Sequence, residues 1–210
     1  MIHQTPFFLP LLYPKQLEWR VPVTNPELYL TFDDGPVPGP TEFVLDTLQA
    51  FAAEATFFCI GDNIRKHPEV FKRIVDDGHR AGNHTFNHLN GWRTNDKTYH
   101  ENTVKCQQLI DESRVHIPGS RPLFRPPYGR ISRSQISLLK DFRIIMWDVL
   151  TRDYDVRLPP ATCLKKSVQA TRPGSIIVFH DSFKAEQNLR HVLPRFLQTF
   201  ADKGYLFKAL

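Results

Sequence analysis

Short apolar runs alternate along the chain with longer segments in which apolar residues recur every three or four positions. The runs predict strands at residues 28–32, 55–60, 143–147, 175–179 and 205–207. The longer segments predict helices at residues 41–53, 68–78, 99–112, 132–140, 160–170 and 186–203. Strands that alternate with helices form βαβ units, so we expect a parallel sheet, either open or closed into a barrel. In both arrangements the residues that act on a ligand lie at the carboxyl ends of the strands.

The length and composition of the chain fit one globular domain. Of 210 residues, 41% are hydrophobic and 23% are charged, which is ordinary for a globular protein. We expect residues 1–27 to form an extended lead-in packed on the outside of a single domain made by residues 28–210. No apolar stretch reaches the length that a membrane span requires.

The net charge of +5 at pH 7 narrows the choice of partners. Lys and Arg are scattered along the chain rather than gathered in one run, so a nucleic-acid partner is not indicated. A solvated basic surface explains the charge, and the alternative is a field that favours an anionic ligand or polymer. The three cysteines, Cys59, Cys106 and Cys163, form neither a disulfide framework nor a Cys-x-x-Cys metal site, and we expect them to be buried.

The first fourteen residues are rich in Phe and Leu, but they lack a basic leader and a small-residue cleavage site. Read literally, this places the protein in the cytoplasm. Removal of an export signal would leave the same sequence, and would fit a secreted or cell-envelope protein. The oligomeric state is left open.

Two adjacent aspartates, Asp33 and Asp34, follow the first predicted strand in the segment Thr-Phe-Asp-Asp-Gly-Pro. Neighbouring side chains on a strand point to opposite faces, so both carboxylates reach one site only if the chain leaves the extended form here. Gly35 and Pro36 favour such a break. The last three residues are equally typical of a plain turn, but two adjacent carboxylates repel each other unless a cation or a proton offsets their charge.

His84 and His88 are four residues apart, a spacing that places two imidazoles on the same side of a helical turn. Two such histidines alone are more often solvated or core residues. Together with Asp34 they make a set of two histidines and one carboxylate that leaves coordination positions open for water and substrate. This arrangement is typical of a catalytic divalent ion.

Three further segments are weaker on their own. In Arg125-Pro-Pro-Tyr128-Gly, the prolines would fix the backbone, present the Tyr128 N–H in a set direction and let Arg125 reach a carboxylate. Trp147 precedes a segment with several acids, and an apolar strand ends on His180. A rigid loop, solvated acids and a histidine at a strand edge explain these features equally well.

Taken in order, the five segments resemble the polysaccharide deacetylase family, also called the NodB homology domain or carbohydrate esterase family 4. The resemblance runs from about Tyr29 to Asp181, and the segments Thr-Phe-Asp-Asp-Gly-Pro and His-Thr-x-x-His are complete. It implies an α/β fold, a distorted (β/α)7-type barrel of parallel strands with outer helices and an active site at the carboxyl ends of the strands.

The resemblance also implies the parts of a metal centre. Asp33 corresponds to the family's general base. Asp34, His84 and His88 correspond to the ligands of one divalent ion, with zinc as the first choice and cobalt, manganese and nickel as alternatives. Arg125 is similar to the residue that orients the base and lowers its pKa.

The remaining roles follow from the same resemblance. The backbone N–H of Tyr128 would meet the oxyanion, and Asp153 would tune His180, the expected general acid. Tyr128, Trp147, Val178 and Trp92 are the expected substrate contacts. The chain departs from the family at Tyr154, where Trp is common, and at Val178, where Leu is common, so we expect an altered pocket shape with the chemistry retained.

The resemblance implies hydrolysis of the N-acetyl amide of an N-acetylglucosamine-containing polysaccharide or oligosaccharide of the peptidoglycan or chitin type, with release of acetate. Three alternatives stay open: an O-acetyl esterase on xylan-type glycans, an amidohydrolase of a non-sugar amide and a non-catalytic carbohydrate-binding protein. The presence of Asp33 and His180 argues against the last, because binding needs neither a base nor an acid.

Overall fold

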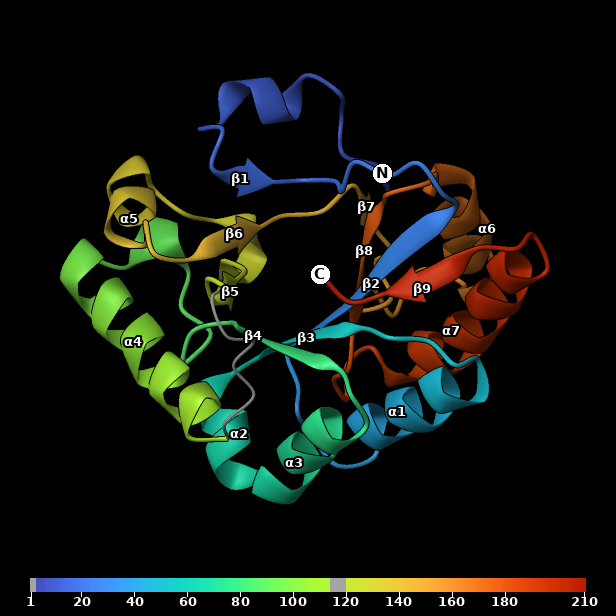
Figure 1. Ribbon diagram of the computed structural model, residues 1–210, viewed down its shortest axis with the longest axis horizontal. Coiled ribbons are helices and arrows are strands. Elements are labelled where there is room, and N and C mark those ends of the chain that lie inside the picture. The colour runs from blue at the N-terminus through green and yellow to red at the C-terminus, as the bar shows by residue number, and fades with distance from the viewer. Residues whose placement is uncertain (1–2, 114–119) are drawn as a thin grey trace.

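A curled parallel sheet runs through the protein and helices surround it (Figure 1). The computed structural model describes residues 3–113 and 120–210. The strands are β1 (Leu17–Glu18), β2 (Glu27–Asp33), β3 (Thr56–Cys59), β4 (Arg80–Asn83), β5 (Leu123–Phe124), β6 (Arg143–Ile145), β7 (Val149–Leu150), β8 (Ile176–His180) and β9 (Leu206–Lys208). They follow the order β1-β6-β5-β4-β3-β2-β8-β7, with β9 beside the start of β2. The predicted α/β fold, a distorted barrel of parallel strands, is confirmed.

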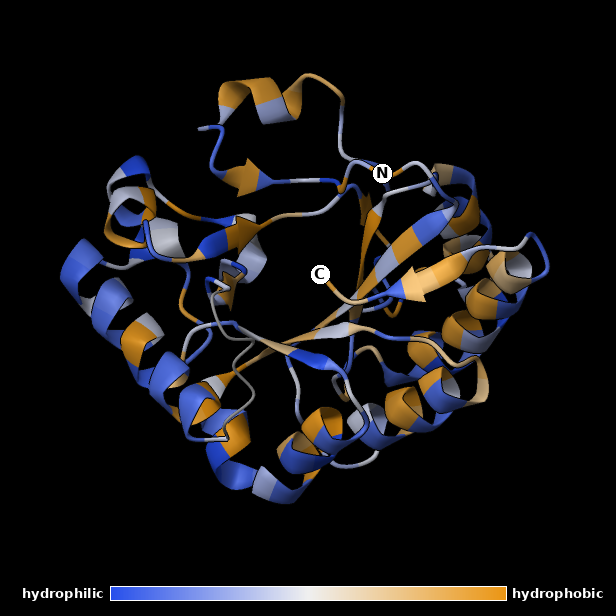
Figure 2. Ribbon diagram, viewed as in Figure 1, coloured by the Kyte–Doolittle hydropathy of each residue, from blue (hydrophilic) through white to orange (hydrophobic). Residues whose placement is uncertain are grey.

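The helices lie outside the sheet, with hydrophobic residues turned inward and hydrophilic residues turned outward (Figure 2). They are α1 (Pro40–Ala50), α2 (Gly61–Lys66), α3 (Pro68–Asp76), α4 (Asp96–Glu112), α5 (Arg133–Leu138), α6 (Pro160–Ala170) and α7 (Glu186–Ala201). Several begin where the sequence supplies a start signal. The side chains of Asn95 and Ser132 cap α4 and α5, and Pro40, Pro68 and Pro160 occupy the first turns of α1, α3 and α6.

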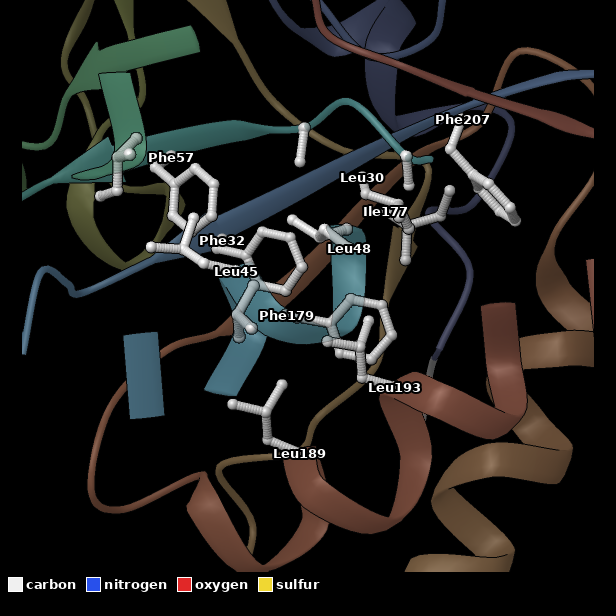
Figure 3. Packing of buried hydrophobic residues seen from close by; sticks show 14 of the residues in the cluster. Leu30, Phe32, Leu45, Leu48, Phe57, Ile177, Phe179, Leu189, Leu193 and Phe207 are labelled. Atoms are coloured by element: carbon white, nitrogen blue, oxygen red, sulfur yellow. The ribbon is translucent and has the colours of Figure 1, made fainter. Parts of the chain in front are cut away.

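The central strand β2 is buried on both faces, and its two faces serve different purposes. Leu30 and Phe32 point outward into the main core, where they meet apolar residues of α1 and α7 (Figure 3), and Leu28 belongs to the same buried cluster. Burial of one such side chain stabilises the fold by about 1.5–3 kcal/mol. The alternate residues belong to the inner face of the barrel, because side chains on a strand alternate. Asp33 is therefore directed into the barrel at the carboxyl end of β2.

Residues near the N-terminus bridge the open edge of the curled sheet. Gln4 forms an antiparallel bridge with Val149 of β7, while Leu17–Glu18 pairs with β6 at the other end of the strand order. A short 3-10 helix, η1 (Leu9–Leu12), lies between these two contacts. The chain from residue 3 to residue 18 thus crosses the opening between the two ends of the sheet (Figure 1).

The predicted strands correspond to β2, β3, β6, β8 and β9, and the predicted helices to α1 and α3 through α7. The sequence pattern missed β1, β4, β5, β7 and α2, because these elements are short and two of them, β4 and α2, are largely polar. The three cysteines are free and buried, as expected. Among the helices of the two described ranges, none combines the length and apolar character needed to cross a bilayer.

Candidate active site

Chemically active side chains gather at the carboxyl edge of the sheet, although they are distant in sequence. Asp33 is the last residue of β2 and His180 the last residue of β8, while His84 and Arg125 directly follow β4 and β5. A cavity of about 440 Å³ opens at this edge. It is lined by Asp33, Asp34, His84, His88, Pro126, Tyr128, Trp147, Leu150, Tyr154, Val178, His180 and Lys184.

Asp33 and Arg125 form a buried ion pair beneath the cavity. An Nη1 hydrogen of Arg125 is donated to Asp33 Oδ1 at 2.7 Å, and the guanidinium is completely buried. The same group donates to Thr31 Oγ1 at 2.7 Å and to the carbonyls of Ile145 and Met146. This network satisfies the buried charge and fixes the direction of the Asp33 carboxylate.

Asp34 leaves the extended form, as its sequence context predicted. Its φ of 82° lies in the left-handed region, and Asn63 donates a hydrogen bond to its carbonyl at 2.7 Å. The next residue, Gly35, donates its N–H to Asp181 Oδ1 at 3.0 Å. A Cβ on Gly35 would stand 1.9 Å from Asp181 Oδ2, so this position requires glycine.

Asp181 is a site residue to which sequence reasoning gave no role, although it directly follows His180. Its side chain is buried, and Thr41 donates a hydrogen bond to its Oδ2 at 2.6 Å. Burial, which outweighs the hydrogen bonds from Thr41 and Gly35, raises the pKa of Asp181 to about 8. Asp181 therefore holds the turn that carries Asp34.

The segment from His84 to His88 is not the helical turn that the spacing predicted. Thr85 and His88 have φ values of 60° and 55°, which an α-helix excludes. Side chains replace the missing helical hydrogen bonds: Asn83 accepts from the N–H of Thr85, and Asn102 accepts from the N–H groups that follow. The two imidazoles still come together, with ring centroids 5.1 Å apart.

Asp34, His84 and His88 each offer one ligand atom, and these atoms lie within 4.8 Å of one another. His88 Nε2 is 3.2 Å and His84 Nε2 is 3.8 Å from Asp34 Oδ1. His84 Nδ1 donates its hydrogen to the carbonyl of Arg125 at 2.8 Å. This bond leaves Nε2 without a hydrogen, in the form that binds a metal ion.

The pKa shifts of His84 and Asp34 favour the protonation states that bind a metal ion. Burial lowers the pKa of His84 to about 4, so its imidazole is neutral near pH 7. Burial alone would raise the pKa of Asp34, but the hydrogen bond with His88 and the nearby histidines lower it. Two imidazoles, one of them held neutral by burial, and one carboxylate make a donor set that suits a divalent ion with open coordination positions.

A second charged pair lines the cavity beside this cluster. His180 Nδ1 lies 2.7 Å from Asp153 Oδ1. The backbone N–H of His180 donates a hydrogen bond to the other oxygen of this carboxylate, Oδ2, at 2.8 Å. Burial would lower the pKa of His180, but the carboxylates of Asp153, Asp34 and Asp33 together outweigh burial and raise it to about 9, with Asp153 contributing most. The ring of Tyr154 packs edge-on against His180, with centroids 4.8 Å apart.

The structure brings together all but one of the residues expected to contact substrate. Tyr128 lies at the cavity rim with a φ of 61°, and its ring is 4.6 Å from that of His88. Trp147 and Val178 also line the cavity. Trp92, by contrast, is not one of the lining residues in the described part of the chain. It lies in the 3-10 helix η2 (Gly91–Arg93), 60% exposed, with the Arg130 guanidinium over its ring, and a sugar contact at Trp92 stays a prediction.

A parallel barrel with an Asp–Arg pair, an open cluster of two histidines and a carboxylate, and a His–Asp pair has the parts of a metal-dependent hydrolase. A family model described as polysaccharide deacetylase matches residues 20–147, more than half of the chain. The chain belongs to the polysaccharide deacetylase family, as the sequence motifs indicated. Members of this family are in general metal-dependent, and the cluster at Asp34 is the candidate metal site.

Two similar proteins and one solved structure carry the same kind of name. A peptidoglycan-N-acetylglucosamine deacetylase of Bacillus cereus is 35% identical over 77% of this chain, which spans 58% of the length of that relative. A second deacetylase of that name and organism is 32% identical over 94% of this chain and 95% of its own. The crystal structure of the Bc1960 peptidoglycan N-acetylglucosamine deacetylase has a TM-score of 0.86 and 31% identity, and covers 98% of this chain and 95% of that chain.

Proposed function

We propose that this chain is a metal-dependent deacetylase that hydrolyses the N-acetyl amide of N-acetylglucosamine in a peptidoglycan- or chitin-type glycan and releases acetate. One observation carries the proposal: a candidate base, a candidate metal cluster and a candidate acid line a single cavity at the carboxyl edge of the sheet. The names of the relatives support the substrate class.

In this proposal the ion is held by Asp34, His84 and His88. Zinc suits this set of two nitrogens and one oxygen best, with cobalt, manganese and nickel as alternatives. A divalent ion there would polarise the amide carbonyl and lower the pKa of a water molecule.

Asp33 is the proposed general base. Its Oδ1 is occupied by Arg125, while Oδ2 lies 4.0 Å from His84 Nε2, beside the candidate ligand cluster. Oδ2 can therefore take a proton from a water molecule that attacks the amide carbon. As the C–O bond forms, negative charge gathers on the amide oxygen, and the N–H of Tyr128 is the proposed donor to it.

His180 is the proposed general acid. Asp153 raises the pKa of His180, so the imidazolium is present near neutral pH and can protonate the nitrogen as the C–N bond breaks. An amine leaves as a neutral molecule only when it receives this proton. An acetyl ester makes a smaller demand, because an alkoxide is a better leaving group than an amine anion.

Acetate release from acetylated peptidoglycan, chitin and xylan fragments tests the proposal. We expect turnover of the amide substrates that stops with a chelator and returns with added zinc. A preference for xylan would favour the O-acetyl esterase. Glycan binding without turnover at saturating metal would favour the carbohydrate-binding alternative, and turnover of small ureides or imides without sugar turnover would favour a non-sugar amidohydrolase.

A further inference from the structure

One cation at the cavity rim has no part in the proposed chemistry. Lys184 lines the cavity from the connection between β8 and α7. The backbone on either side of this connection is anchored, because Asp181 and Ala185 are buried. The side chain of Lys184 is exposed, and its Nζ lies 5.5 Å from the centre of the Tyr154 ring. The ring therefore positions the ammonium over the cavity.

The charge of Lys184 is not matched by a carboxylate. Within the ranges that the structure describes, Lys184 forms no ion pair. Two acids near it in the chain or beside Tyr154 have other partners: Glu186 pairs with Arg190, and Asp155 pairs with Arg152. The two carboxylates that line the cavity also have partners: Asp33 pairs with Arg125, and Asp34 lies against His88. An unmatched ammonium at the rim of a cavity attracts an anionic ligand group.

The position of Lys184 indicates which part of a ligand it would meet. Tyr154 packs against the ring of His180, and Lys184 lies over Tyr154, so the ammonium is two contacts away from the proposed acid. That separation suits a group on a sugar beside the reacting one rather than the reacting amide itself. The net charge of +5 favours an anionic ligand in the same sense.

We propose that Lys184 and Tyr154 form a subsite for a carboxylate on the sugar next to the one that loses its acetyl group. The inference rests on the proposed function, and it makes Lys184 a residue that determines specificity. The chain would then act preferentially on glycans in which acidic sugars alternate with acetylated amino sugars.

A matched pair of substrates tests this subsite: an oligosaccharide in which N-acetylglucosamine neighbours N-acetylmuramic acid, and the same molecule with its carboxylate converted to a carboxamide. At low ionic strength we expect kcat/KM for acetate release to be about twofold to fivefold higher for the acid, which is the range for an exposed ion pair. Added salt should reduce this ratio. In Lys184→Gln the ratio should fall to about 1.

Lys203→Gln is the control, because Lys203 is also exposed and also lies over a ring, that of Phe200, but it precedes β9 at the opposite edge of the sheet. This variant should keep the wild-type ratio. Calorimetric affinities of metal-free protein for the two oligosaccharides give the same comparison without turnover. An equal ratio in Lys184→Gln and wild type, or no preference in wild type, would overturn the subsite. Absence of acetate release alone would overturn the proposed function, while the affinities still decide the role of Lys184.

Discussion

The Asp153–His180 pair makes the sharpest prediction of the structure. Burial by itself would lower the pKa of His180 from its ordinary 6.5, yet the contact with Asp153, aided by the charges of Asp34 and Asp33, raises it to about 9. In Asp153→Asn the size of the side chain is kept and the charge is lost. Burial, the largest single effect on this group, is then opposed only by the charges of Asp34 and Asp33, so we expect the pKa of His180 to fall from about 9 to 6.5 or lower.

The size of the effect follows from these two values. At pH 7.5 a pKa of about 9 gives roughly a thirtyfold excess of protonated His180, whereas a pKa of 6.5 leaves at most about one tenth as much protonated as neutral. In the proposed mechanism His180 acts in its protonated form, so activity should be present below its pKa and be lost as the pH rises through it. Amide turnover by Asp153→Asn should therefore drop at least about tenfold at pH 7.5 and much less at pH 5.5.

The assay is acetate release from an acetylated chito-oligosaccharide between pH 5 and 10. A cation bound near Asp34 would lower the pKa of His180 in both proteins, so the measured quantity is the difference between the pH values at which their activities fall on the alkaline side. Asp155→Asn is the control, since Asp155 pairs with Arg152 and does not contact His180. In this variant, activity should fall on the alkaline side at the same pH as in the wild type. If Asp153→Asn lowers activity by the same factor at every pH and does not shift the pH at which activity falls, the assignment of His180 as an acid tuned by Asp153 is refuted.

Four further substitutions test the rest of the site. Asp34→Asn should lower zinc occupancy and turnover together, whereas Asp33→Asn should keep the metal and lose turnover; elemental analysis beside acetate release would reveal the reverse outcome, which contradicts their roles. Gly35→Ala should drive Asp181 away and reduce both metal content and turnover at least about tenfold, and full activity in a folded variant would contradict the role of the turn. Arg125→Met leaves a buried carboxylate without its partner, so urea unfolding should show a loss of about 3–5 kcal/mol, and a loss below about 1 kcal/mol would show that Asp33 finds another partner.

The sequence predicted the parts of the fold that have a regular hydrophobic pattern. The strand at Leu28–Phe32 and the helix that begins at Pro68 are examples, because both bury a periodic set of apolar residues. Strand β4 was not predicted, since Arg80–Asn83 has no apolar alternation and is held by its neighbours β3 and β5 on either side. Tertiary pairing, rather than local preference, makes that segment a strand.

The candidate site was predicted from residue types in a fixed order, but the geometry behind it was not. The spacing of His84 and His88 suggested a helical turn, and the two rings meet in a loop instead. The support from Asn83 and Asn102 comes partly from a helix distant in sequence. No local pattern carries such information, because these asparagines are equally typical of any loop.

Backbone strain links the fold to the function. Asp34, His88 and Tyr128 have φ values of 82°, 55° and 61°, a conformation that costs a residue other than glycine about 1–3 kcal/mol. In an extended chain Asp34 would point away from Asp33, toward the helix layer. The left-handed turn brings both carboxylates to one cavity, and the buried Asp181 holds that turn. Strain is thus tolerated where side chains must converge on the cavity. Local conformational preferences favour a negative φ for aspartate, histidine and tyrosine, so they do not predict the geometry that the site requires.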